Sequence, residues 1–355
     1  MRIAFVAMET TWHDDRRGTR RFERVARQLA TDGHEVTLFC GQFWDDYTDE
    51  YVEDDLRYRG VSLGTATASF CTRLPALLAA SRPDVIHVHP APPQQVLAAE
   101  TGAKLARAPL VLEWFGDEPL DRGHRLTRWA TGTPDLIVTP SELVRTRVRE
   151  HGGTEDGTVV IPESIDFDRA DAVEPAESVD VAFAHPLDES ANIEDLLLGL
   201  AELREREWSA TIIGDGPMRE EYEQEARDLR IDDRITWAGA CDRERRLAVY
   251  KGAHAFVQTA YREDFASELL WALACGCIGI VEYQAESSAH ELIENYDRSY
   301  RVTDPKELAN AIVDAAEFEQ LTTDDHWKSY DHGAVAQQYV DAYERIQGQR
   351  RPLSR

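Results

Sequence analysis

Short apolar runs alternate with longer amphipathic stretches along the first half of the chain. Continuous apolar runs are typical of strands buried on both faces, and the stretches between them repeat their apolar residues with a helical period. Strands and helices in alternation favour a doubly wound parallel sheet. The expected strands are residues 2–7, 34–40, 85–88, 110–114, 136–138 and 159–161, and a helix is expected from about residue 19 to residue 32, ended by Gly33.

The same alternation begins again after residues 168–178, which are acidic, contain Pro175 and show no period. A chain of 355 residues is too long for one ordinary hydrophobic core, so we place a domain boundary in this segment. The second series has expected strands at residues 179–183, 210–213, 235–237, 255–257 and 278–281, and expected helices at residues 193–205, 218–230, 243–251, 267–274, 306–318 and 333–347.

Residues 263–276 contain a short helix between two of these strands. Ser267 is expected to cap the helix and Gly276 to stop it. Glu263 is then expected at the carboxyl end of a strand, beside the start of a helix. Ligands bind at this edge of an open parallel sheet, and the free N–H groups of a helix start suit an anion. The pattern therefore predicts a ligand site around Glu263.

The composition is acidic and poor in lysine. The chain has 39 basic and 66 acidic side chains, a net charge of −27, and only four lysines. Such a balance is typical of a protein kept soluble in a cytoplasm of high salt. It disfavours a nucleic-acid partner, since phosphate binding needs a basic face. Positive charge gathers locally where Arg16, Arg17 and Arg20 flank Gly18.

Other motifs narrow the function further. The five cysteines have no paired spacing, which predicts reduced thiols and no metal motif. The start of the chain does not resemble a signal peptide, and no apolar run reaches about 18 residues, so a cytoplasmic location is expected. The run Gly214-x-Gly216-x-x-Arg219 lacks the third glycine of the dinucleotide fingerprint, which disfavours a hydride-transfer enzyme.

Residues 263–276 resemble the donor-site motif of the retaining glycosyltransferases with the GT-B fold, of the family 4-like and group 1 type, here with a haloarchaeal composition. That motif reads Glu-Gly-Phe-Gly, followed by a helix with a second Glu and by Ala-x-Ala-Cys-Gly. The chain matches the motif at Glu263, Phe265, Ala272, Ala274, Cys275 and Gly276, and it departs from the motif at Asp264, Ala266 and Trp271.

Further segments resemble the same family in the same order along nearly the whole chain. They are residues 83–89, 135–141, 161–166 and 213–217, together with Gly239. The resemblance implies an α/β protein of two Rossmann-like domains with doubly wound parallel sheets, facing a central cleft. Residues 1–170, with the helix 333–347 crossing back, would form the acceptor-side domain, and residues 178–325 would form the donor-side domain.

The resemblance also implies an activity: transfer of a hexosyl group from a nucleotide-linked sugar, with retention and without a metal or cofactor. The acceptor would be a glycan, a lipid-linked sugar or a small molecule, and a lipid-linked acceptor would bring the protein to the inner membrane surface. Glu263 would be the catalytic residue, holding sugar hydroxyls and stabilising the developing positive charge. The donor-binding residues would be Phe265, Ala266, Ser267, Glu268, Gly214 and His185, and the acceptor-side residues would be Gly18, Arg16, Arg17 and Arg20.

The chain departs from the family where charge is needed. Pro186 and Ala191 replace the two cations that neutralise the donor diphosphate, and Phe115 stands where a His is common. A transferase would then need another arginine at the helix start, and the candidates are Arg16, Arg17, Arg20 and Arg262.

Two kinds of alternative stay open. The whole protein could be a degenerate GT-B protein that binds a ligand or a partner subunit without turnover. Single residues also have structural interpretations: Glu268 in solvent, His185 hydrogen-bonded within its loop, the arginines on a solvated helix face paired with Glu23, and Trp271 packed in the core.

Overall fold

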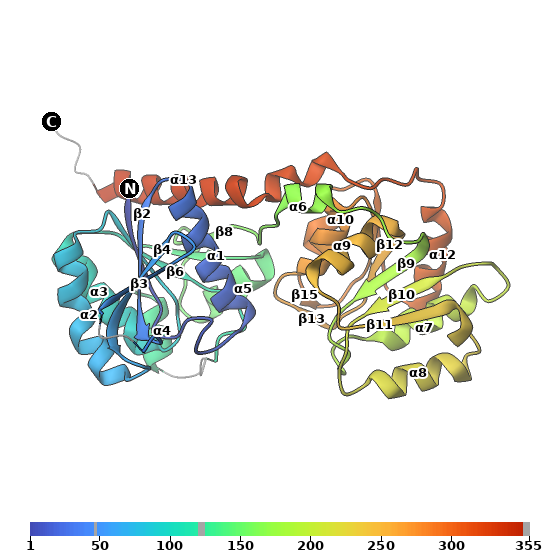
Figure 1. Ribbon diagram of the computed structural model, residues 1–355, viewed down its shortest axis with the longest axis horizontal. Helices are drawn as coiled ribbons and strands as arrows, with labels where there is room; N and C mark the ends of the chain where they lie inside the picture. Colours follow the sequence, from blue (N-terminus) through green and yellow to red (C-terminus); the bar gives the residue numbers. More distant parts are fainter. Residues whose placement is uncertain (46–47, 120–124, 351–355) are drawn as a thin grey trace. The chain divides into compact units, whose positions relative to one another are not determined.

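The computed structural model describes residues 1–45, 48–119 and 125–350 (Figure 1). The chain divides into two compact units. Unit 1 comprises Met1–Glu163 and the segment from His332 onward, and unit 2 comprises Ser164–Asp331. The division precedes the acidic segment 168–178, and Phe167–Ala172 (α6) is helical where the sequence predicted an irregular connection.

The strands of unit 1 are Arg2–Val6 (β1), Glu35–Gln42 (β2), Glu50–Glu53 (β3), Leu56–Leu63 (β4), Val85–Val88 (β5), Leu110–Glu113 (β6), Leu136–Thr139 (β7) and Thr158–Val160 (β8). Among the described residues they form one sheet in the order β3-β4-β2-β1-β5-β6-β7-β8. Neighbouring strands are parallel except β3 and β4, which are antiparallel at one edge. The strand order reverses between β1 and β5, and ligands of open α/β sheets bind beside such a reversal.

Helices cover both faces of this sheet, as Figure 1 shows. The helices are Arg17–Thr31 (α1), Thr67–Ser81 (α2), Pro93–Ala106 (α3), Arg125–Thr131 (α4), Glu142–Glu150 (α5) and the C-terminal His332–Arg350 (α13). Phe22 of α1 and Tyr343 of α13 belong to the core on one face. Phe70 of α2 and Val96 of α3 belong to the core on the other face.

Unit 2 repeats this plan. Its main strands are Val179–Ala184 (β9), Ala210–Ile213 (β10), Ile235–Gly239 (β11), Ala253–Gln258 (β12), Ile278–Glu282 (β14) and Ser299–Val302 (β16). All neighbouring pairs are parallel, in the order β11-β10-β9-β12-β14-β16, so the order reverses between β9 and β12. A separate short pair consists of Arg262–Glu263 (β13) and Glu286–Ser287 (β15).

The helices of unit 2 pack on both faces of its sheet. They are α6, Ile193–Glu202 (α7), Arg219–Asp228 (α8), Arg243–Gly252 (α9), Ser267–Ala274 (α10), Ala289–Ile293 (α11) and Pro305–Ala315 (α12), with 3-10 helices at Asp232–Arg234 and Asp325–Tyr330. Leu196 of α7 and Leu308 of α12 share one core with Val257. The neighbouring Phe256 faces the opposite side, where its ring meets Tyr250 of α9 at 5.4 Å.

The predicted α/β class with two parallel sheets is confirmed. The sequence analysis did not predict the β3–β4 hairpin. The side chains of β3 alternate between exposed and half-buried and include two glutamates. A polar edge strand of this kind lacks the continuous apolar run by which the predicted strands were identified.

Candidate active site

Glu263 lies beside the point where the strand order of unit 2 reverses. Nε2 of His185, in the loop after β9, is 3.4 Å from Oε1 of Glu263, and both side chains are buried. The sequence pattern predicted Glu263 at the carboxyl end of a strand of the main sheet. In the structure, Glu263 belongs to the short β13 instead. Its carbonyl oxygen accepts a 2.8 Å hydrogen bond from the N–H of Ser288. The β13–β15 pair therefore fixes the backbone that carries Glu263.

The loop that carries His185 packs against the turn after β10. The N–H of His185 donates to the carbonyl oxygen of Ile213 (3.1 Å), and Nδ1 of His185 lies 2.8 Å from the carbonyl oxygen of Pro186. Gly214 has a φ of +141°, and a Cβ there would collide with the carbonyl oxygen of His185. Gly214 thus permits the close approach of the two loops, and the structure brings it together with His185.

Two buried amide side chains lie at the same end of this sheet, and the sequence analysis did not single them out. Nε2 of Gln258, the last residue of β12, is 3.4 Å from Oε1 of Glu263. Nδ2 of Asn192 donates to the carbonyl oxygen of Thr259 (3.3 Å). Within the described part of the chain, Oε1 of Gln258 and Oδ1 of Asn192 are buried and accept no hydrogen bond. Because unpaired buried carbonyls are costly, this end of the sheet favours a ligand that donates hydrogen bonds.

A second buried carboxyl group, Glu282, ends β14. It accepts hydrogen bonds from Nε2 of Gln284 (2.9 Å) and Nδ2 of Asn192 (3.3 Å). Burial and the neighbouring Asp195 carboxyl raise the pKa of Glu282 to about 8. Glu282 therefore holds a proton at neutral pH, which lets the carboxyl groups of Glu282 and Asp195 lie close together.

The start of α10 differs from the prediction. Ala266 takes the N-cap position and the helix begins at Ser267, so within the described residues no side chain caps it. Ala266, with a φ of −81° and a ψ of 72°, has the non-helical backbone of the cap residue, and the N–H of Ser267 bonds to the carbonyl oxygen of Phe265 (3.0 Å). Phe265 and Ala266 are buried. Gly276, with a φ of +89°, follows the last turn and ends the helix as predicted.

The Glu268 side chain is held by α9. Its carboxylate is 3.3 Å from Arg243, 2.5 Å from Arg246, and accepts a 2.6 Å hydrogen bond from the Tyr250 hydroxyl. None of the described contacts of Glu268 involves Glu263 or His185. Glu268 is thus neither in solvent nor joined to the Glu263 group, and its contacts fix α10 against α9.

The basic side chains at α10 come from α9. Cζ of Arg243 lies 4.7 Å from the centroid of the Trp271 ring, and Trp271 is only 7% exposed. Arg262 was the predicted residue of this segment for this role, and Arg243 and Arg246 were not predicted. Pro186 is exposed and Ala191 is buried in the core, so neither position supplies a polar group.

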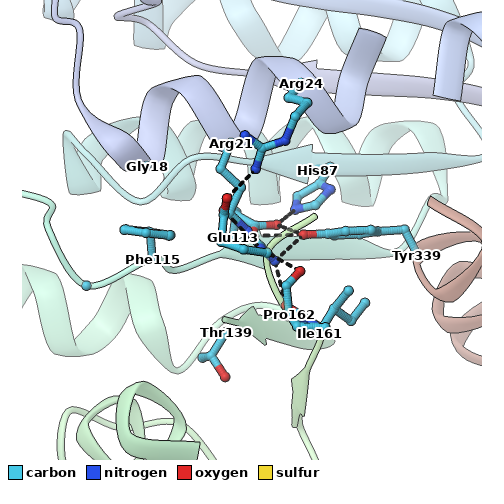
Figure 2. Close-up of polar contacts among 12 residues, drawn as sticks. Gly18, Arg21, Arg24, His87, Glu113, Phe115, Thr139, Ile161, Pro162 and Tyr339 are labelled. Carbon is cyan, nitrogen blue, oxygen red and sulfur yellow. Dashed lines mark hydrogen bonds and ion pairs between the residues drawn. The ribbon is translucent and has the colours of Figure 1, made fainter. Parts of the chain in front are cut away.

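In unit 1, Gly18 lies in the first turn of α1, beside the strand reversal (Figure 2). Its N–H donates to Oδ2 of Asp117 (3.1 Å), which follows β6, and a Cβ on Gly18 would lie 2.6 Å from Oδ1 of Asp117. Nη1 of Arg16 donates to the carbonyl oxygen of Asp117 (3.3 Å). The structure therefore groups Gly18 and Arg16 around Asp117. The available signal in the sequence was an acid in the loop that follows β6.

The loop after β6 also buries a second acid. The carboxylate of Glu118 accepts hydrogen bonds from the N–H groups of Phe115 (2.6 Å) and Gly116 (2.8 Å). Burial and the neighbouring Asp117 raise the pKa of Glu118 to about 8. Burial lowers the pKa of His89 to about 4, so this side chain is neutral at pH 7.

The arginines near Gly18 do not form a free basic patch. Nε of Arg20 pairs with Asp15 at 2.5 Å, and Nη2 of Arg16 pairs with Asp14 at 2.7 Å. Glu23 is 3.8 Å from Arg27. Acids of the same loop therefore balance the positive charge that the sequence singled out.

A buried polar cluster ties the C-terminal helix to unit 1. Figure 2 shows the side chains of Arg21, Glu113, His87 and Tyr339 pointing toward one another. Arg21 donates to Glu113 (2.6 Å) and to the Tyr339 hydroxyl (2.6 Å), and His87 lies 3.0 Å from Glu113. The remaining acceptors of Arg21 are the carbonyl oxygens of Ile161 and Pro162 and the carboxylate of Glu163. The charged groups of the cluster pair with one another, which indicates a structural role.

Two further observations concern the described residues only. No group of three or more His, Cys, Asp or Glu side chains among them has the geometry to hold a metal ion. None of the helices within 1–45, 48–119 and 125–350 has the length and hydropathy needed to span a membrane.

Two units, each with a doubly wound parallel sheet, have the architecture of the GT-B fold. Residues 18–163 match the family described as Glycosyl transferase 4-like domain, and residues 164–330 match Glycosyl transferases group 1. The chain therefore belongs to the GT-B glycosyltransferases, with a 4-like domain followed by a group 1 domain. A comparison with the curated proteins finds no match for this sequence.

Solved structures share the fold at low identity. A glycosyltransferase from Rickettsia africae is 15% identical, with a TM-score of 0.75 and coverage of 97% of this chain and 98% of that one. The apo form of the lipopolysaccharide outer core galactosyltransferase WaaB is 17% identical, with a TM-score of 0.71 and coverage of 97% and 99%. Anabaena HepE in complex with UDP is 16% identical, with a TM-score of 0.68 and coverage of 98% of each chain.

Proposed function

We propose that the protein transfers a hexosyl group, with retention, from a nucleotide-linked sugar to a glycan, a lipid-linked sugar or a small molecule. The observation that carries the proposal is the buried Glu263 beside His185 and Gln258, at the strand reversal of the group 1 domain. The structure of HepE with UDP-glucose supports a nucleotide-linked donor. The protein would work in the cytoplasm, and a lipid-linked acceptor would bring it to the inner membrane surface.

In this proposal Glu263 is the catalytic residue. Its carboxylate accepts hydrogen bonds from hydroxyls of the donor sugar and stabilises the positive charge that develops as the glycosidic bond breaks. The unpaired oxygens of Gln258 and Asn192 accept hydrogen bonds from further sugar hydroxyls. His185 holds the carboxylate in place from the other side of the reversal. A sugar ring, with several O–H donors, fits this set of acceptors.

The leaving nucleotide needs a different set of groups. The N–H of Ser267 bonds to the carbonyl oxygen of Phe265, so the N–H of Ala266 and those of the residues after Ser267 in the first turn of α10 would favour a phosphate group. Phe265 and Gly214 shape the surrounding backbone. Pro186 and Ala191 supply no charge, and α9 brings two arginines to α10: Arg243, stacked on Trp271, and Arg246, paired with Glu268. We assign Arg243 to the nucleotide, and we assign Glu268 to holding Arg243 and Arg246 in place.

The acceptor side belongs to unit 1. Gly18, Arg16 and Asp117 form one hydrogen-bonded group at the start of α1, and Arg17 and Arg20 lie on the same turn. An acceptor hydroxyl would be oriented there by Asp117 and by the N-terminal turn of α1. No metal or cofactor enters this proposal.

The test is release of nucleotide from a panel of UDP- and GDP-linked hexoses, in molar KCl, with and without simple sugar acceptors. Acceptor-stimulated release from one of them supports the proposal. The absence of a cation at Pro186 and Ala191 favours a second candidate, a non-catalytic GT-B protein that binds a ligand or a partner subunit. That candidate predicts that the protein binds the nucleotide sugar but releases nucleotide no faster than a sample without protein.

A further inference from the structure

A basic pocket lies at the amino ends of the strands of the unit 1 sheet. The candidate site around Gly18 lies at the other end of these strands. The pocket has a volume of about 480 Å³, and its lining includes Arg2, Arg82, Asp84, Leu105, Arg107 and Gln347. Arg2 begins β1, Arg82 and Asp84 precede β5, and Arg107 precedes β6. These are the amino ends of the strands, whereas Gly18 and Asp117 lie at the carboxyl ends.

The charge of this pocket opposes that of the chain. Three guanidinium groups face one carboxylate, in a protein with 66 acidic and 39 basic side chains. Among the described residues, the side chains of Arg2, Arg82 and Arg107 form no hydrogen bond or ion pair. The one carboxylate, Asp84, accepts the backbone N–H of Arg2 (2.7 Å). The pocket therefore carries a net positive charge that the protein itself does not neutralise.

The backbone at two of these arginines is unusual. Arg82 has a φ of +49° and Arg107 a φ of +60°, at the ends of α2 and α3. Glycine is the common residue in this left-handed conformation, and a larger side chain is strained there. A cation at a helix C-terminus complements the helix dipole, which accounts for Arg82 and Arg107. The helix dipole does not account for Arg2, which begins a strand. Nor does it account for the pocket that the three arginines line.

We propose that this pocket binds a phosphate-type oxyanion, in addition to the proposed transferase site. Guanidinium groups match the geometry of phosphate oxygens and form charge-assisted hydrogen bonds with them. The volume suits a phosphorylated small molecule. The phosphate belongs either to a free molecule or to a lipid headgroup, and Leu105, 62% exposed at the rim, adds apolar contact in either case.

The test compares the protein with the double variant Arg82→Asn, Arg107→Asn. Asparagine tolerates the left-handed conformation, so the change removes charge without new backbone strain. The matched control is Arg230→Asn, because Arg230 is also exposed and has a φ of +59° but lies in unit 2. Binding of inorganic diphosphate is measured by calorimetry, and binding to phosphatidylglycerol vesicles is measured by sedimentation. Thermal unfolding checks that each variant is folded.

Diphosphate binding that weakens roughly 100-fold in the double variant and is unchanged in the control supports a free oxyanion, at about tenfold per lost contact. A lipid headgroup is supported if the unaltered protein and the control bind the vesicles, the double variant does not, and none of the three binds diphosphate. The double variant leaves the site around Glu263 intact, so any binding there appears equally in all three proteins. Equal binding by all three, or no binding of either probe by the unaltered protein, overturns the proposal.

Discussion

Arg21 of α1 donates a 2.6 Å hydrogen bond to the hydroxyl of Tyr339 of α13, and that hydroxyl lies 3.0 Å from the carboxylate of Glu113. Both side chains are fully buried within unit 1. A buried guanidinium is tolerated only when its N–H groups find acceptors. The C-terminal helix therefore completes the polar interior of the N-terminal domain.

The first prediction concerns this hydrogen bond. Tyr339→Phe removes the acceptor of one Arg21 N–H and a donor to Glu113, so it should lower the free energy of unfolding by about 1–3 kcal/mol. Tyr261→Phe, at a residue 47% exposed, is the control and should have no measurable effect. Chemical denaturation measures both. Equal stability of the two variants would show that the cluster does not hold α13.

The second prediction concerns the pH dependence of stability. The pKa of Glu282 is raised from 4.5 to about 8 by burial and by Asp195. Between these values the folded protein binds more protons than the unfolded chain, so the Glu282 contribution to stability falls as pH rises from about 4.5 to about 8. Glu282→Gln should flatten this decline, measured as the unfolding midpoint at pH 5 and pH 8.5. A decline as steep as that of the unaltered protein would contradict the raised pKa of Glu282.

The fold was predictable because most buried strands are short apolar runs, and residues 136–138 and 255–257 show this plainly. The position of Glu263 near the helix 267–274 was predictable for the same reason. The direction in which a side chain points was not predictable from the sequence. The sequence cannot show that Glu268 contacts α9, because Arg243 and Arg246 approach it from a separate helix. Nor can it show the unpaired oxygens of Gln258 and Asn192, which depend on what lies around them.

The third prediction tests the assigned role of Arg243. Arg243→Ala should weaken the binding of nucleoside diphosphates about tenfold or more, because a charge-assisted hydrogen bond to phosphate is lost. Arg245→Ala is the control, since Arg245 is exposed on the same helix. Calorimetry with UDP and GDP gives the affinities. The same affinity in both variants would remove Arg243 from the proposed donor site.

The fourth prediction concerns the acceptor side. Gly18→Ala places a Cβ 2.6 Å from Oδ1 of Asp117, so the Asp117 carboxylate must move. The KM for the acceptor should rise by about tenfold or more, while donor binding should not change. Gly348→Ala is a suitable control, because a Cβ at Gly348 meets nothing within 4 Å. A change in donor affinity with unchanged acceptor kinetics would contradict this assignment.

The central claim is that Glu263 acts on the donor sugar. The direct measurement is nucleotide release from the preferred nucleotide sugar by Glu263→Gln, compared with Glu189→Gln, an exposed glutamate of the same domain. The account predicts that Glu263→Gln stays folded, still binds the nucleotide, and loses at least ~100-fold in turnover, while Glu189→Gln keeps its rate. Undiminished turnover in folded Glu263→Gln would contradict it.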